Sequence, residues 1–99
     1  MSEEEKLEQE AIAVTSSEDV PAVYFNGFIN SLSNGDVMII LKRNNRPVAV
    51  LNASYTVAKS LAQKLSQTIA YLEDATGNPI MTTDTVRSDL EKGAQSDDA

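Results

Sequence analysis

The most constraining feature of this sequence is a pair of short segments that are apolar at successive positions. Residues 37–41 read Val-Met-Ile-Ile-Leu, and residues 48–51 read Val-Ala-Val-Leu. Side chains alternate between two faces along a β-strand, so a strand with one face in water alternates apolar and polar residues. These two segments do not alternate. We therefore predict two strands that need cover on both faces.

Tight turns connect these strands to each other and to a third strand. Residues 33–36 contain Asn-Gly, which is a strong signal for a hairpin. Asn44 and Asn45 tolerate the positive φ of a two-residue turn. Residues 22–33 are rich in residues that favour strands, with Gly27 suggesting a bulge or a close backbone approach. Because both connections are short, we predict a three-stranded antiparallel meander.

A regular apolar stripe predicts one long helix after the strands. Its members recur at three- and four-residue steps: Ala58, Leu61, Ala62, Leu65, Ile69 and Leu72. Ser54 suits the N-cap, and Gly77 with Pro79 suits the end of the helix. The predicted fold is therefore α+β, with a meander followed by one long helix in the order β-β-β-α.

One helix covers only one face of such a sheet. A second copy is the simplest cover for the other face, because self-complementary twofold contacts are the commonest way to form homo-oligomers. We expect a homodimer or a higher even oligomer. Its interface is expected to draw on six side chains: Tyr24, Phe28, Met38, Ile40, Ala49 and Leu51. The alternative is that the N-terminal segment or residues 80–86 cover this face within one chain.

Charge is divided unevenly along the chain. The formal net charge is −7, but residues 20–72 carry an excess of four positive charges, whereas both ends are strongly acidic. Acidic, polar ends of this kind are typical of disordered segments. We expect a folded domain over residues 20–80 between acidic disordered tails at 1–19 and, for most of its length, 81–99. A sharper alternative is that the tails fold back on the basic middle.

The composition argues against catalysis. The chain has neither Cys nor His, so it lacks the commonest general base and the commonest transition-metal ligand. Its four glycines are isolated and form no phosphate-binding loop. We expect a protein that is not an enzyme, with no catalytic residue, no cofactor and no metal site.

Two functional classes fit what is left. The first is a small oligomeric protein-interaction or structural and regulatory module with a protein partner. Acidic tails suit such a module, and they could also imitate nucleic acid toward a basic partner. The alternative is a nucleic-acid-binding protein whose contacts are Lys42, Arg43 and Arg46 at a hairpin tip, with the acidic tails modulating binding. Aromatic residues at 24, 25 and 28 resemble those that stack on single-stranded bases. The basic residues also have a purely structural explanation, because charged side chains at a hairpin tip keep the turn soluble.

The ends of the sequence bear on location. Residues 1–10 are acidic and polar, unlike a signal peptide, which needs a positive start and an apolar run. No segment approaches the length of about 18 apolar residues that a membrane span needs. We expect a cytoplasmic protein without a membrane partner.

Residues 23–80 resemble a family of short prokaryotic proteins known only as a domain of unknown function. The family pattern is Tyr-x-Asn, then Ser-x-x-Asp before an apolar strand, then Ser-x-x-x-Ala-Lys at the start of a Leu-rich helix that a Gly follows. The matching positions are Tyr24, Asn26, Ser33, Asp36, Ser54, Ala58, Lys59, Leu61, Leu65 and Gly77. The chain has Tyr55 where the family often has Pro, and Ala75-Thr76 where the family has an aromatic residue before Gly. The resemblance implies a bacterial, archaeal or phage origin and a β-β-β-α core, without an activity.

Overall fold

The computed structural model describes residues 2–97, and the side chains of residues 2–93. These residues form three helices and three strands in the order α1 (Glu3–Thr15), β1 (Gly27–Ser33), β2 (Asp36–Arg43), β3 (Arg46–Ser54), α2 (Tyr55–Thr76) and α3 (Thr83–Asp97). The chain divides into two units, Met1–Tyr55 and Thr56–Ala99, and the strands all belong to the first. The α+β class is confirmed.

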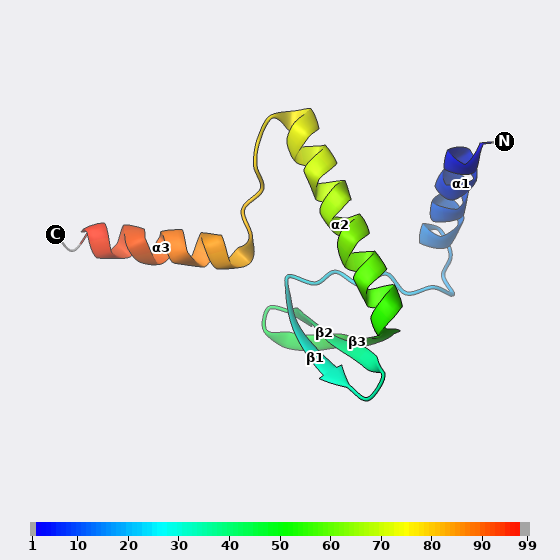
Figure 1. Ribbon diagram of the computed structural model, residues 1–99, viewed down its shortest axis with the longest axis horizontal. Helices are drawn as coiled ribbons and strands as arrows, with labels where there is room; N and C mark the ends of the chain where they lie inside the picture. The colour runs from blue at the N-terminus through cyan, green and yellow to red at the C-terminus, as the bar shows by residue number, and fades with distance from the viewer. Residues whose placement is uncertain (1, 98–99) are drawn as a thin grey trace. The chain divides into compact units, whose positions relative to one another are not determined.

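The sheet is an antiparallel meander in the order β1-β2-β3, with β2 in the middle (Figure 1). Both turns have two residues. Asn44 and Asn45 have φ of 51° and 68°, as expected for a tight hairpin turn whose twist matches that of its strands. In the first turn Gly35 has φ of 87°, a value that favours Gly. The predicted meander and both turns are therefore confirmed.

The first strand is shorter than the sequence suggests. We expected it to begin near residue 22, but β1 begins at Gly27, and residues 21–25 have no regular structure. Its partner strand explains the difference. The Asn26 N–H donates to the carbonyl oxygen of Lys42, and β2 then turns at Asn44. The chain before residue 26 therefore has no neighbouring strand with which to pair.

A bulge interrupts the pairing of β2 with β3. Leu41 lies opposite Ala49, whereas Lys42 lies opposite Pro47, so Val48 is the extra residue. Proline has no N–H to give to a sheet, and it is tolerated at edge strands and bulges. β3 is an edge strand, which explains how it accommodates Pro47. The irregularity lies here and not at Gly27, where the sequence suggested it.

The observed register divides the sheet side chains between two faces. The first, called face 1 below, is made up of nine residues in the central part of one side: Phe28, Asn30, Leu32, Val37, Ile39, Leu41, Ala49, Leu51 and Ala53. The paired Arg43 and Arg46 continue this side at the β2–β3 turn. The opposite surface, called face 2, contains Ile29, Ser31, Met38, Ile40, Val50 and Asn52 in its central part. Face 1 is apolar at every position except Asn30, and face 2 mixes apolar and polar side chains.

Little of this apolar surface is buried. Leu41 is the one core side chain among the described residues, with 5% of its surface exposed. Its neighbours on face 1 are open, since Phe28 and Leu32 remain 57% and 78% exposed. Two-sided apolar strands are thus present as predicted, whereas the cover of each face, by a helix or by a second copy, stays a prediction.

Helix α2 begins directly after β3, with Ser54 in the N-cap position. Its end follows the expected pattern, because Gly77 has φ of 69° and Pro79 follows. The Glu73 carboxylate accepts a hydrogen bond of 2.7 Å from the N–H of Ile80. This bond ties the chain after Gly77 to the last turns of the helix.

The two acidic ends contain helices where we expected disorder. In α1 the hydroxyl of Ser2 accepts from the N–H of Glu5, and three Glu residues occupy the first turn, where negative charge is favourable. In α3 the hydroxyl of Thr82 accepts from the N–H of Thr85. Residues 80–82 have no regular structure, and residues 83–86 belong to α3. Residues 1, 98 and 99 of the expected tails lie outside the described residues.

Among the described residues, none of the three helices is long and apolar enough to cross a lipid bilayer.

Candidate functional site

The tip of the β2–β3 hairpin places two arginines directly opposite each other. Arg43 is the last residue of β2 and Arg46 the first of β3, and the register pairs them across the turn. Like charges directly opposite each other in a sheet are unfavourable. Lys42 precedes Arg43 and therefore lies on the other face of the hairpin. The predicted basic tip is present, with Arg43 and Arg46 as its paired members.

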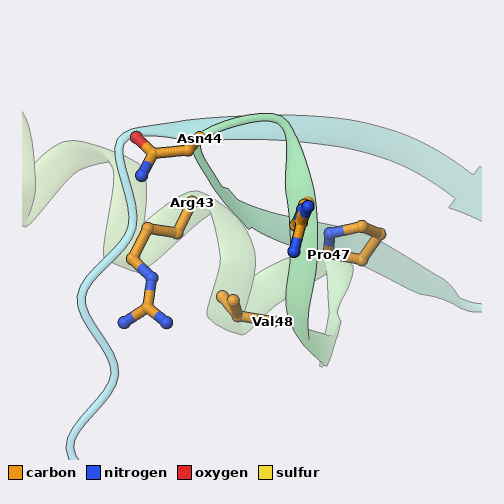
Figure 2. A pocket seen from close by; sticks show the side chains of 5 residues that line it. Arg43, Asn44, Pro47 and Val48 are labelled. Atoms are coloured by element: carbon orange, nitrogen blue, oxygen red, sulfur yellow. The ribbon is translucent and has the colours of Figure 1, made fainter.

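Among the side chains that the structure describes, no acidic group neutralises this pair, and neither guanidinium group makes a hydrogen bond or an ion pair. A surface hollow at the tip is lined by Arg43, Asn44, Arg46, Pro47 and Val48. Figure 2 shows Arg43 extended along one side of the hairpin, with the amide of Asn44 turned toward the segment that leads into β1. An anion in this hollow would relieve the repulsion between the two guanidinium groups.

Asn26 holds the tip in place. Its side-chain oxygen accepts a 2.9 Å hydrogen bond from the N–H of Asn44, and its amide nitrogen donates to the side-chain oxygen of Asn44 at 3.0 Å. With the bond to Lys42, Asn26 makes three contacts with this end of the hairpin. The chain just before β1 is thereby fixed beside the basic tip.

Tyr55 plays the corresponding role at the other end of the sheet. Its hydroxyl accepts from the N–H of Gly35 at 3.1 Å and donates to the carbonyl oxygen of Ser33 at 2.6 Å. One phenol group therefore satisfies a donor and an acceptor of the β1–β2 turn. Each turn of the meander is thus held by a side chain that flanks the strand outside that hairpin. Tyr55, just after β3, bonds to the β1–β2 turn, and Asn26, just before β1, bonds to the β2–β3 turn.

Sequence reasoning missed the roles of Asn26 and Tyr55. Asn26 entered only as part of a family pattern, and Tyr55 only as a departure from it. The available signal was topological. In a three-stranded meander the start of the first strand lies beside the second turn, and the end of the third strand lies beside the first turn. Polar side chains at those two places are therefore candidates for bonds to turn backbone.

The structure separates the six side chains predicted to form one interface. Phe28, Ala49 and Leu51 lie on face 1, and Met38 and Ile40 lie on face 2. Tyr24 precedes the sheet altogether. Without the bulge, the turn pairing of Arg43 with Arg46 would put Ala49 opposite Ile40 and Leu51 opposite Met38. The extra residue at Val48 moves β3 by one position and so exchanges its faces.

The described side chains contain no cluster of three or more His, Cys, Asp or Glu residues placed to hold a metal ion. No protein-family model, curated protein or solved structure matches the chain. The resemblance to a prokaryotic family of unknown function therefore stays an expectation.

Proposed function

We propose that this chain is a self-associating, non-enzymatic interaction module that forms a homodimer through face 1 of its sheet. The observation that carries the proposal is the contrast between composition and burial on this face. Eight of its nine side chains are apolar, and only Leu41 is buried. A three-stranded sheet needs a covered apolar face for independent stability.

Charge favours face 1 over the rest of the surface as the site of contact. The chain carries a net charge of −7, so two copies repel each other at most orientations. The nine side chains of face 1 are uncharged, and the pair Arg43 and Arg46 lies beyond them, at one end of the same side of the sheet. It is therefore the surface on which two copies can approach with the least electrostatic cost and the greatest loss of apolar area to water.

The polar residue on this face is compatible with a second copy. Asn30 carries both a donor and an acceptor in its amide group. Across a twofold axis, two such amides can bond to each other, so neither needs to be left unsatisfied. A second copy is also present wherever the chain is made, whereas a different partner would leave the free chain with its apolar face in water. Sheets packed face to face in this way are a common arrangement.

A pair of neighbouring substitutions on β3 tests the proposal. Leu51→Asp puts a carboxylate on face 1, and Asn52→Asp puts the same group one residue further, on face 2. We expect Leu51→Asp to weaken self-association at least about a hundredfold, because a charge buried without a partner costs several kcal/mol. Asn52→Asp is the matched control and should change it little. The measurement is sedimentation equilibrium of the full chain.

The alternatives give different results in this experiment. If helix α2 of the same chain covers face 1, both the native protein and the Asn52→Asp variant sediment as monomers. If a different protein covers it, the native chain is again monomeric. Equal effects of the two substitutions would place the contact elsewhere and contradict the role of face 1.

A further inference from the structure

The hydrogen bonds of Asn26 bring two kinds of side chain to one edge of the sheet. Asn26 is fixed to Asn44 in the basic tip. Tyr24 and Phe25 directly precede it, so the segment that carries them must pass the same end of the hairpin. Arg43 and Arg46 lie at that end. All of these residues belong to the first unit of the chain.

These aromatic side chains are open to solvent. Tyr24 is 69% exposed, and Phe25 is 46% exposed. Neither is part of the sheet, so neither is required for strand pairing. Aromatic residues on strands are usually core residues, but this explanation does not apply to a pair that precedes the strand and is not buried. We call Tyr24, Phe25, Arg43 and Arg46 the basic edge.

We propose that the basic edge binds single-stranded nucleic acid. In this arrangement Arg43 and Arg46 contact phosphate groups, and Tyr24, the more exposed of the two rings, stacks on an adjacent base. Guanidinium groups match phosphate oxygens in a two-pronged geometry, and stacking on aromatic rings is how proteins hold unpaired bases. The proposal does not depend on self-association, although a dimer would carry two such edges.

The combination of residues favours a single strand over other anions. In a duplex the bases are already stacked on each other, so exposed rings gain little. An acidic peptide offers carboxylates to the arginines but no flat base for the rings. The net charge of −7 opposes any polyanion. Binding should therefore be weak, and it should depend on the local basic edge and strongly on salt.

The test is fluorescence anisotropy of a labelled oligothymidylate of about 15 nucleotides, a length that spans one small binding site. The full chain is titrated between about 20 and 200 mM salt, where phosphate contacts change affinity most visibly. The slope of log affinity against log salt is negative, and the double variant Arg43→Ala with Arg46→Ala should make it less steep by about 1.4, or about 0.7 for each lost contact. The double variant Lys59→Ala with Lys64→Ala removes the same charge from α2 and should keep the native slope.

A second pair of variants tests the stacking. Tyr24→Ala should lower the affinity about tenfold, as expected for the loss of one base–aromatic contact. Tyr71→Ala, at a tyrosine of α2 that is 76% exposed, should leave it unchanged. Far-UV circular dichroism checks that each variant keeps the native spectrum. The salt dependence of the native chain tests the phosphate contacts without any substitution.

The following results would overturn the proposal. They are no anisotropy change at low salt, a native slope too small for two phosphate contacts, equal effects of the two tyrosine variants, and displacement by polyglutamate as efficient as by unlabelled oligothymidylate. Tighter binding to a duplex of equal length would likewise argue against stacking and contradict it. Binding that weakens with salt, with the slope carried by the two arginines and a loss on Tyr24→Ala, would support it.

Discussion

At the scale of single residues, two polar side chains hold the geometry of the meander. Tyr55 bonds to both backbone groups that flank the first turn, and Asn26 bonds to the backbone and side chain of the second. These bonds act at turns that contain residues with positive φ, Gly35 in the first and Asn44 and Asn45 in the second, a backbone conformation that most residues rarely adopt. With so few side chains buried, fixed turns are a substantial part of what selects this register.

The hydroxyl of Tyr55 provides the first test at this scale. Tyr55→Phe keeps the ring but removes both hydrogen bonds to the turn. We expect the free energy of unfolding to fall by about 1–2 kcal/mol, because each such bond contributes about 0.5–1.5 kcal/mol net. Tyr71→Phe is the control, because the structure gives that hydroxyl no partner among the side chains described. Urea unfolding at one fixed protein concentration measures both. An equal change in the two variants would show that the bonds to the first turn contribute nothing specific.

At the scale of elements, the β2–β3 hairpin combines a turn, a bulge and a basic pair within eight residues of chain. The turn depends on the two asparagines, and the bulge places Ala49 and Leu51 on face 1. A bulge and a proline also protect an edge strand from pairing with other sheets. Edge-to-edge association of two copies through β3 is therefore less favourable than contact through face 1.

The two asparagines of this turn offer a second prediction. Asn44→Gly and Asn45→Gly both allow positive φ, so neither introduces backbone strain. Only Asn44 receives a side-chain bond, from the amide of Asn26. We expect Asn44→Gly to reduce the free energy of unfolding by about 0.5–1 kcal/mol more than Asn45→Gly. Thermal unfolding at equal concentration compares them, and a larger loss in Asn45→Gly would refute the role of Asn26.

The elements could be predicted to the extent that local chemistry fixes them. Asn44-Asn45 and Gly77 have backbone conformations that few other residues accept, so the second turn and the end of α2 were visible in the sequence. The start of β1 was not, because it depends on where β2 stops offering a partner. The residues that make up face 1 could not be predicted from the sequence either, because one extra residue at Val48 exchanges the two faces of β3. Helices at both ends depend on weak capping signals, against a composition typical of disorder.

At the scale of the whole molecule, charge and apolar surface are separated. The acidic residues lie mainly toward the two ends of the sequence, and the basic pair lies at one hairpin tip. The nine residues of face 1, which this pair borders, are uncharged. Salt should therefore have opposite effects on the two proposed contacts. It screens the repulsion between acidic chains and so favours contact through face 1, whereas it weakens contact between the basic edge and phosphate.

The central claim is that the chain covers face 1 with a second copy of itself, and its mass in solution tests this most directly. Light scattering of the native chain at micromolar concentration should give twice the chain mass of 10.7 kDa. The dimeric mass should persist or become more complete as salt is raised, because screening lowers the repulsion between chains of charge −7. A mass of one chain at both low and high salt would contradict the account.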